Sequence, residues 1–227
     1  MSEFFPHERQ FLRVLLSAGY RPEIIYDIGA STGIWSETIA TVLPEAAYEL
    51  FEPLATHPLY GPHHQDRTQR LSRFRVHPVA FGDKNSEEQM CVTPDAYGSS
   101  LLDRGAIPEI SERIPIQVFR LDDFASQNKL PAPNVIKIDC QGAEAAIIRG
   151  GFNTVSCADV LFLETWLQRG YGPQTPLLAE IIQQLRPLFF TIVDIGEKFF
   201  DDRHRLYSVD AFFCSERLLK DFRLPFP

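Results

Sequence analysis

Short apolar segments alternate with amphipathic segments along most of the chain, and this alternation limits the possible folds more than any other feature. Segments 6–19 and 31–43 repeat apolar residues at helical spacing, and the first has proline near its start and glycine at its end. Strand-length apolar stretches are "EIIYD", "AYELFEP", "VIKIDC" and "DVLFLE". The alternation predicts an α/β fold, with a mostly parallel sheet covered by helices on both faces.

The other segments are expected to complete one domain over residues 1–227, which begins with the helix at about 6–19. We expect "RFRVHPVAFGD" (73–83) to form one strand, and "LFFTIVDIG" and "YSVDAFFCSE" to form a closing hairpin. Residues 54–73 contain prolines and a glycine, so no regular helix is expected there. A chain of 227 residues with 44% hydrophobic content can bury a core of this size.

The charge pattern excludes some classes of partner. The net charge is -8 and no block of basic residues occurs, so nucleic acid is not an expected partner. No segment approaches the roughly 18 apolar residues of a membrane span, and the first residues do not resemble a secretory signal. The four cysteines form no CxxC pair, which predicts reduced thiols in a cytoplasmic protein.

The loop "DIGASTG" (27–33) follows the first strand, at the end where parallel sheets bind ligands. Gly29 and Gly33 lie four residues apart, and the GxGxxG pattern that admits a pyrophosphate is missing. Glu52 ends the second strand, where a carboxylate can accept hydrogen bonds from both hydroxyls of a ribose. An adenosine without a pyrophosphate is therefore the predicted ligand. The alternative is that Asp27 and Ser31 only cap a helix and that Glu52 is a solvated strand end.

The strand "VIKIDC" places a lysine in a segment that should be buried on both faces. An unpaired ammonium is costly there, so Lys137 needs a carboxylate partner. Asp139 lies on the same face, and Glu164 ends the neighbouring strand "DVLFLE". These residues predict a charged network at the floor of the ligand cleft, or a purely structural ion pair.

Several blocks of the sequence resemble FkbM-type S-adenosylmethionine-dependent methyltransferases. The blocks, which run from residue 24 to residue 214, are "IIYDIGASTGIWS", "FEP", "PVAFGD", "GSSLL", "LDDF", "IKIDCQGAEAAIIRGG", "LETWLQRGYGPQTPLLAEII" and "SVDAFFC". The resemblance implies a Rossmann-like class I fold with seven strands and an antiparallel last strand. It also implies methyl transfer, commonly to a hydroxyl oxygen of a sugar, a glycan or another natural product.

The resemblance also implies roles for individual residues. Those expected to line the methionine part of S-adenosylmethionine are Asp27, Gly29, Ala30, Ser31 and Gly33. Glu52 would hold the ribose and Ala80 would border the adenine. Apart from the resemblance, the loop "AYGSSLLD" predicts that Ser99 and Ser100, with Tyr97, form a lid over the cofactor or an ordinary turn.

The chain departs from the family pattern at three places. Ser31 stands where asparagine is usual, Gln141 stands where glutamate is frequent, and the usual helix after Glu52 is not evident. Gln141 removes a candidate base or metal ligand, which argues against a metal-assisted reaction. The irregularly spaced histidines near Asp66, namely His57, His63 and His64, are interpreted as surface residues rather than a metal site.

Methyl transfer to an alcohol requires a group that takes the proton. Asp139 and Glu164 are the expected general bases, and Lys137 is expected to tune them. The residues expected to contact the acceptor are Trp166, Arg169 and Tyr171, because an aromatic face packs against a sugar ring.

Three other functions remain open from the sequence. Methyl transfer to nitrogen or carbon would need less help from a base, and a nucleoside-binding module without catalysis would need none. A nucleotide-sugar oxidoreductase would need the phosphate glycines and a Tyr-xxx-Lys pair, which the sequence lacks.

Overall fold

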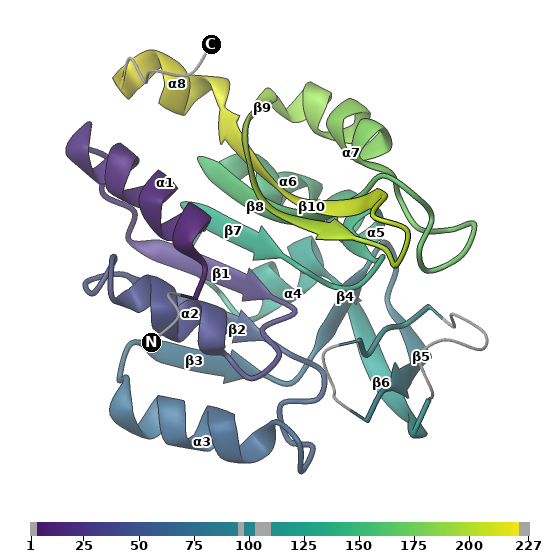
Figure 1. Cartoon of the computed structure of the whole chain (residues 1–227). Coiled ribbons are helices and arrows are strands. Elements are labelled where there is room, and N and C mark those ends of the chain that lie inside the picture. Colours follow the sequence, from purple (N-terminus) through teal and green to yellow (C-terminus); the bar gives the residue numbers. More distant parts are fainter. Residues whose placement is uncertain (1–3, 95–97, 103–109, 223–227) are drawn as a thin grey trace.

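A seven-stranded sheet forms the centre of the protein, in a computed structural model that describes residues 4–94, 98–102 and 110–222 (Figure 1). Its strands, in spatial order, are β3 (Phe74–His77), β2 (Ala47–Phe51), β1 (Ile24–Ile28), β7 (Val135–Ile138), β8 (Val160–Trp166), β10 (Leu206–Ser215) and β9 (Phe190–Phe200). Neighbouring strands from β3 to β8 are parallel, whereas β10 is antiparallel to both β8 and β9. The expected sheet with an antiparallel last strand is confirmed.

The central strands are apolar on both faces because helices cover both faces. In β1, Ile25 packs in the core that includes the first two helices, whereas Tyr26 and Ile28 pack in the core on the opposite face. Side chains of successive strand residues point to opposite faces, so a doubly covered strand shows a continuous apolar run.

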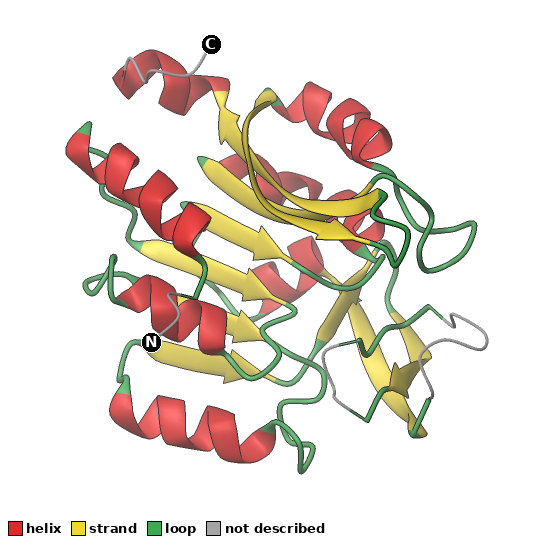
Figure 2. Cartoon of the chain, viewed as in Figure 1, coloured by secondary structure: helices red, strands yellow, loops and turns green. Residues whose placement is uncertain are grey.

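Helices lie on both sides of the sheet (Figure 2). The helices that pack with the first core are α1 (Pro6–Ser17), α2 (Ile34–Ala40) and α8 (Glu216–Phe222). The opposite core includes α4 (Leu121–Gln127), α5 (Glu144–Gly150), α6 (Phe152–Cys157), α7 (Leu178–Leu185) and the short 3-10 helix η1 (Arg186–Leu188). None of the helices in the described part of the chain is both long and apolar enough to span a bilayer.

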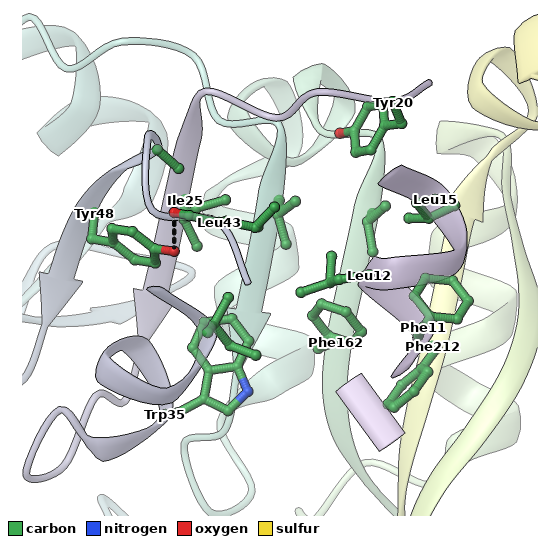
Figure 3. Packing of buried hydrophobic residues seen from close by; sticks show 14 of the residues in the cluster. Phe11, Leu12, Leu15, Tyr20, Ile25, Trp35, Leu43, Tyr48, Phe162 and Phe212 are labelled. Carbon is green, nitrogen blue, oxygen red and sulfur yellow. Dashed lines mark hydrogen bonds between the residues drawn. The ribbon is translucent and has the colours of Figure 1, made fainter. Parts of the chain in front are cut away.

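The N-terminal helix packs its apolar side against the middle of the sheet. Phe11 lies edge-on to Phe162 of β8 and Phe212 of β10, with ring centroids 5.8 Å and 5.3 Å apart (Figure 3). Leu12 and Leu15 of α1 are buried in the same core. These contacts follow from the helical spacing of the apolar residues in segment 6–19, and they attach the start of the chain to β8 and β10.

A second, three-stranded sheet lies beyond the carboxyl ends of β1, β2 and β3 (Figure 1). Its strand order is β4 (Ala80–Gly82), β6 (Glu112–Arg120) and β5 (Ser86–Val92). The prediction of a single strand over 73–83 is therefore wrong, because β3 and β4 belong to different sheets. Pro78 lies between them, has no backbone N–H and cannot continue the ladder of β3.

The expectation of no regular helix over 54–73 is also wrong, because α3 covers Gly61–Arg70. The side chains that α3 buries are those of His64 and Arg67. Polar residues thus occupy the inward face of the helix, so the sequence lacks the apolar spacing by which an amphipathic helix is recognised.

The strand order reverses between β1 and β7. From β1 the chain proceeds to β2 and β3 on one side, whereas β7 and β8 extend the sheet on the other side. Loops that leave the carboxyl ends of β1 and β7 therefore diverge, and the crevice between them is where open α/β sheets bind ligands.

Candidate active site

A central cavity of about 260 Å³ lies at this reversal of strand order. Its wall includes Gly29 and Ser31 after β1, Glu52 after β2, Asp139 after β7 and Glu164 of β8. The small sheet closes another side with apolar residues, namely Ala80, Phe81 and Met90. The cavity therefore combines an apolar wall with carboxyl groups that come from three strands of the central sheet, namely β2, β7 and β8.

The glycine loop approaches the β7 loop too closely for a side chain at Gly29. This residue has a φ of +74°, and a Cβ there would overlap the carbonyl oxygen of Asp139. The backbone N–H groups of Gly29 and Ala30 both donate to the carbonyl oxygen of Phe51. Only glycine permits this approach, which brings the ends of β1, β2 and β7 around one space.

Glu52 holds the glycine loop through its carboxylate. One carboxylate oxygen accepts a hydrogen bond from the Ser31 N–H at 2.8 Å, and the other accepts one from the Leu54 N–H at 2.9 Å. Burial raises the pKa of Glu52 to about 7, although both hydrogen bonds favour the charged form. Each oxygen retains a second lone pair, so Glu52 can still accept hydrogen bonds from a ligand in the cavity.

His64 holds the same loop from α3. Its Nε2 lies 2.6 Å from the carbonyl oxygen of Ser31, and its side chain is buried. Burial lowers the pKa of His64, so its imidazole is neutral near pH 7 and donates from Nε2. The interpretation of all three histidines as surface residues is wrong for His64, whereas His63 is exposed and His57 is half-buried beside Glu112.

Lys137 and Asp27 form a buried ion pair beneath the loop. The Lys137 ammonium lies 3.2 Å from Asp27 Oδ1 and 3.6 Å from Asp139 Oδ2, and it donates to the carbonyl oxygen of Gly29 at 2.9 Å. Burial alone would lower the pKa of Lys137, but the charges of Asp27 and Asp139 raise it above its ordinary value. The structure thus supplies the expected carboxylate partner through Asp139 and through Asp27, but it does not pair Lys137 with Glu164.

Gln141 joins the two candidate bases. Its side-chain amide nitrogen donates to Asp139 Oδ1 at 2.9 Å and to Glu164 Oε2 at 2.8 Å. Burial raises the pKa of Glu164 well above its ordinary range, and the negative charge of Asp139 raises it further. Two carboxyl groups are therefore held side by side at the wall of the cavity by one amide group.

Other predicted site residues lie behind the wall of the cavity. The residues in this position are Asp27, Ala30, Gly33 and Ser100, and none of them lines the described part of the cavity. Ser100 donates from its hydroxyl to the backbone oxygen of Gln141 at 2.8 Å. Ser99 does line the cavity, and Tyr97, the third member of the expected lid, lies outside the described residues.

The three residues expected to contact an acceptor also lie outside the cavity wall. Trp166 and Tyr171 are buried and pack edge to face with ring centroids 5.0 Å apart, while Arg169 pairs with Glu180. The Tyr171 hydroxyl donates to the side-chain oxygen of Gln141. Tyr171 thus orients the Gln141 amide, which joins the two carboxyl groups. Its hydroxyl contacts a residue of the site and does not face the space where an acceptor would bind.

Two residues that shape the site have no such role in the prediction from sequence. Gln141 stands out there only as a departure from a family pattern, although its amide can donate to two acceptors at once. His64 lies on α3, a helix that no apolar spacing indicates. The "KIDCQGAE" block pointed to Gln141, whereas no local signal pointed to His64.

The strand order, the antiparallel β10 and a cavity at the reversal of strand order define a Rossmann-like class I methyltransferase fold. A family model described as the methyltransferase FkbM domain matches residues 27–190. Because this match covers most of the chain, the protein belongs to the FkbM methyltransferase family.

Individual relatives agree with the family match. The 2-O-methyltransferase NoeI of Sinorhizobium fredii is 28% identical over 191 residues, which cover 78% of this chain and 76% of the relative. The hexuronic acid methyltransferase AglP of Haloferax volcanii is 25% identical over 179 residues, which cover 76% of this chain and 68% of the relative.

A solved structure shares the fold at low sequence identity. The methyltransferase FkbM of Methylobacillus flagellatus KT aligns with a TM-score of 0.52 and 20% identity. The alignment covers 85% of this chain and 43% of that longer chain. The likeness therefore concerns the fold of the methyltransferase part.

Proposed function

We propose that the protein transfers the methyl group of S-adenosylmethionine to a hydroxyl oxygen of a sugar or of a related natural product. The observation that carries this proposal is the pair of carboxyl groups of Asp139 and Glu164, which Gln141 holds at the wall of the cavity. The names of NoeI and AglP, which describe a 2-O-methyltransferase and a hexuronic acid methyltransferase, support a sugar acceptor.

The residues around the cavity fit the parts of this cofactor. Glu52 would accept hydrogen bonds from the ribose, because both of its oxygens are fixed by backbone N–H groups and keep free lone pairs. Ala80 and the neighbouring Phe81 and Met90 would form the apolar wall for the adenine. Gly29 and Ser31 would border the methionine part, while Asp27 supports their loop from below through Lys137.

S-adenosylmethionine, when bound, supplies a methyl group on a sulfonium, which is already activated toward a nucleophile. The residues of the chain then have to align the acceptor, exclude water and remove one proton. Glu164 is the better placed general base, because Asp139 already lies beside the Lys137 ammonium. Its carboxylate accepts the hydroxyl proton as the new oxygen–carbon bond forms and the carbon–sulfur bond breaks. A positioned base of this kind contributes roughly 10²–10⁴-fold.

Calorimetric titration with S-adenosylmethionine, and separately with NAD, tests the cofactor assignment. We expect the wild-type protein to bind S-adenosylmethionine and not NAD. The Glu52→Ala variant should bind roughly 10–100-fold more weakly, since hydrogen bonds to a charged group contribute about 1.5–3 kcal/mol. Glu45→Ala is the matched control, because the Glu45 side chain is exposed. Binding of NAD, or of neither ligand, would overturn the proposal.

Methyl transfer to a panel of hydroxylated sugars tests the assigned base. We expect Glu164→Gln to lower kcat by roughly 10²-fold or more while S-adenosylmethionine still binds. Asp139→Asn should lower kcat less than Glu164→Gln does, since Asp139 lies beside the base but does not itself accept the proton. If neither amide variant changes turnover, the base assignment is wrong, and methyl transfer to an amine becomes the better hypothesis.

A further inference from the structure

A second and smaller space, the acidic cleft, lies beside the central cavity between the start of α1 and strands β7, β8 and β10. Four carboxyl groups line it, from Glu8, Asp139, Glu164 and Asp210, together with Lys137 and Trp35. Asp139 and Glu164 line both the cavity and the cleft. The cleft encloses about 30 Å³, which is room for one water-sized group such as a hydroxyl. A group in the cleft therefore contacts the two candidate bases.

Asp210 and Glu164 occupy directly opposite positions in the antiparallel pair of β10 and β8. Like charges in opposite positions destabilise a sheet. Among the residues that the structure describes, the Asp210 side chain has no hydrogen bond and no ion pair. Burial raises the pKa of Asp210 to about 8 and also raises the pKa of Glu8. Within the described part of the chain, Asp210 therefore lacks the partners that stabilise buried acids such as Asp27 and Glu52.

Trp35 supplies a buried donor at the same cleft. Its side chain is 3% exposed, and its indole N–H has no hydrogen-bond acceptor within the described part of the chain. Figure 3 shows the indole nitrogen on the side of the ring that faces Phe162, which also lines the cleft. A buried donor without an acceptor destabilises the fold, and a hydroxyl oxygen in the cleft would provide the acceptor.

Among the described residues that line the cleft, no cation is free to pair with a negatively charged ligand. Lys137 is the one basic residue among the described residues that line it. The ammonium of Lys137 already contacts Asp27, Asp139 and the carbonyl oxygen of Gly29. A carboxylate placed here would lose its hydration beside four carboxyl groups without gaining a counter-ion, and a charge buried without a partner is costly.

We propose that the acidic cleft receives one hydroxyl group of the methyl acceptor and that it selects an acceptor without negative charge. The carboxyl oxygens accept hydrogen bonds from the acceptor's hydroxyl or amino groups, and the Trp35 N–H donates to an acceptor oxygen. A neutral sugar or an amino sugar satisfies these groups, whereas a uronic acid brings a carboxylate against them. This selectivity rests on the proposed methyl transfer to a sugar.

Matched acceptors test the selectivity. Methyl hexopyranosides of several configurations are compared with their uronic acid and 2-amino counterparts, with transfer of a labelled methyl group from S-adenosylmethionine as the readout. We expect kcat/KM to be on the order of 100-fold higher for the neutral or amino sugar than for the uronate, because the carboxylate of the uronate would be desolvated in the cleft without a counter-ion. Comparison of kcat/KM between the neutral sugars and the 2-amino sugars shows which of these two classes is the better acceptor.

Two variants connect the selectivity to the cleft. Asp210→Asn should reduce the discrimination against the uronate by roughly tenfold, because the amide cannot ionise and its N–H groups can donate to a carboxylate at similar size. Asp194→Asn, at an exposed position of β9, makes the same substitution outside the cleft and should leave the ratio unchanged.

Three outcomes have distinct meanings. Equal or better use of the uronate by the wild-type protein overturns the charge selectivity and leaves the proposed function intact. Methylation of no sugar in the panel, while calorimetry still shows cofactor binding, overturns the acceptor assignment. Absence of S-adenosylmethionine binding overturns the proposed function itself.

Discussion

Gln141 illustrates how one side chain sets the chemistry of two others. An amide nitrogen can donate two hydrogen bonds, and here it donates one to Asp139 and one to Glu164. The hydroxyl of Tyr171 donates to the amide oxygen, which determines the orientation of the amide. A glutamate at this position would bring a third carboxyl group and would have no proton to donate when ionised. Glutamine at this position therefore supplies a donor where an ionised glutamate would supply only acceptors.

The Gln141→Glu variant should shift the pH dependence of methyl transfer. The added negative charge would raise the pKa of Glu164 further, so the rate should reach its plateau at higher pH, by about one unit or more. At pH 7, kcat should fall by roughly tenfold. The measurement is kcat against pH, with the exposed Gln89→Glu as the matched control. An unchanged profile with only a lower melting temperature would show that Gln141 is merely structural.

At the scale of elements, α3 is the clearest difference between expectation and structure. The alternating strands and helices are predictable from the sequence because apolar side chains occupy the faces that these elements bury. The sequence did not predict α3, because His64 and Arg67 are the residues that this helix buries. Arg67 pairs with Glu37 of α2 at 3.0 Å, and His64 contacts the glycine loop. These polar contacts join residues far apart in sequence, so the local spacing of apolar residues cannot predict them.

His64→Ala should therefore weaken both the fold and cofactor binding. Loss of the bond to Ser31 leaves a buried carbonyl oxygen without its partner and a space beneath the loop, at a cost of about 1–3 kcal/mol in the free energy of unfolding. The affinity for S-adenosylmethionine should fall several-fold, because Ser31 lines the cavity. Thermal unfolding and calorimetry measure the two effects. His63→Ala, exposed on the same helix, should change neither, and equal effects of the two variants would contradict the assigned role of His64.

Over the whole molecule, the sequence predicted the mostly parallel sheet and a ligand site at its strand ends, but it did not predict the set of acids that meets beside that site. Glu52 and Asp139 directly follow recognisable strands and Glu164 lies near the end of β8, so the parallel sheet brings them to one edge. Glu8 comes from the first helix and Asp210 from the last hairpin. Their arrival at the same cleft depends on how α1 and β10 pack, which the alternation of segments does not determine.

These buried acids should make the stability of the protein fall as the pH rises. Burial raises the pKa of Glu52 and of Glu144 to about 7 and that of Asp210 to about 8, above unfolded values of about 4. A carboxyl group whose pKa is raised by folding stabilises the protein fully below its unfolded pKa. That contribution is lost as the pH rises through the folded pKa.

The free energy of unfolding of the wild-type protein should therefore decrease between pH 5 and pH 9, with the steeper part below about pH 8. Asp210→Asn removes one of these groups, so its stability relative to the wild type should increase with pH, by an amount on the order of 1.4 kcal/mol for each pH unit at most. Urea denaturation at several pH values measures the difference. Asp194→Asn, with its exposed side chain, should follow the wild-type curve. If the Asp210→Asn curve also runs parallel to the wild type, Asp210 is not a buried neutral acid, and the acidic cleft carries more negative charge at neutral pH than this structure implies.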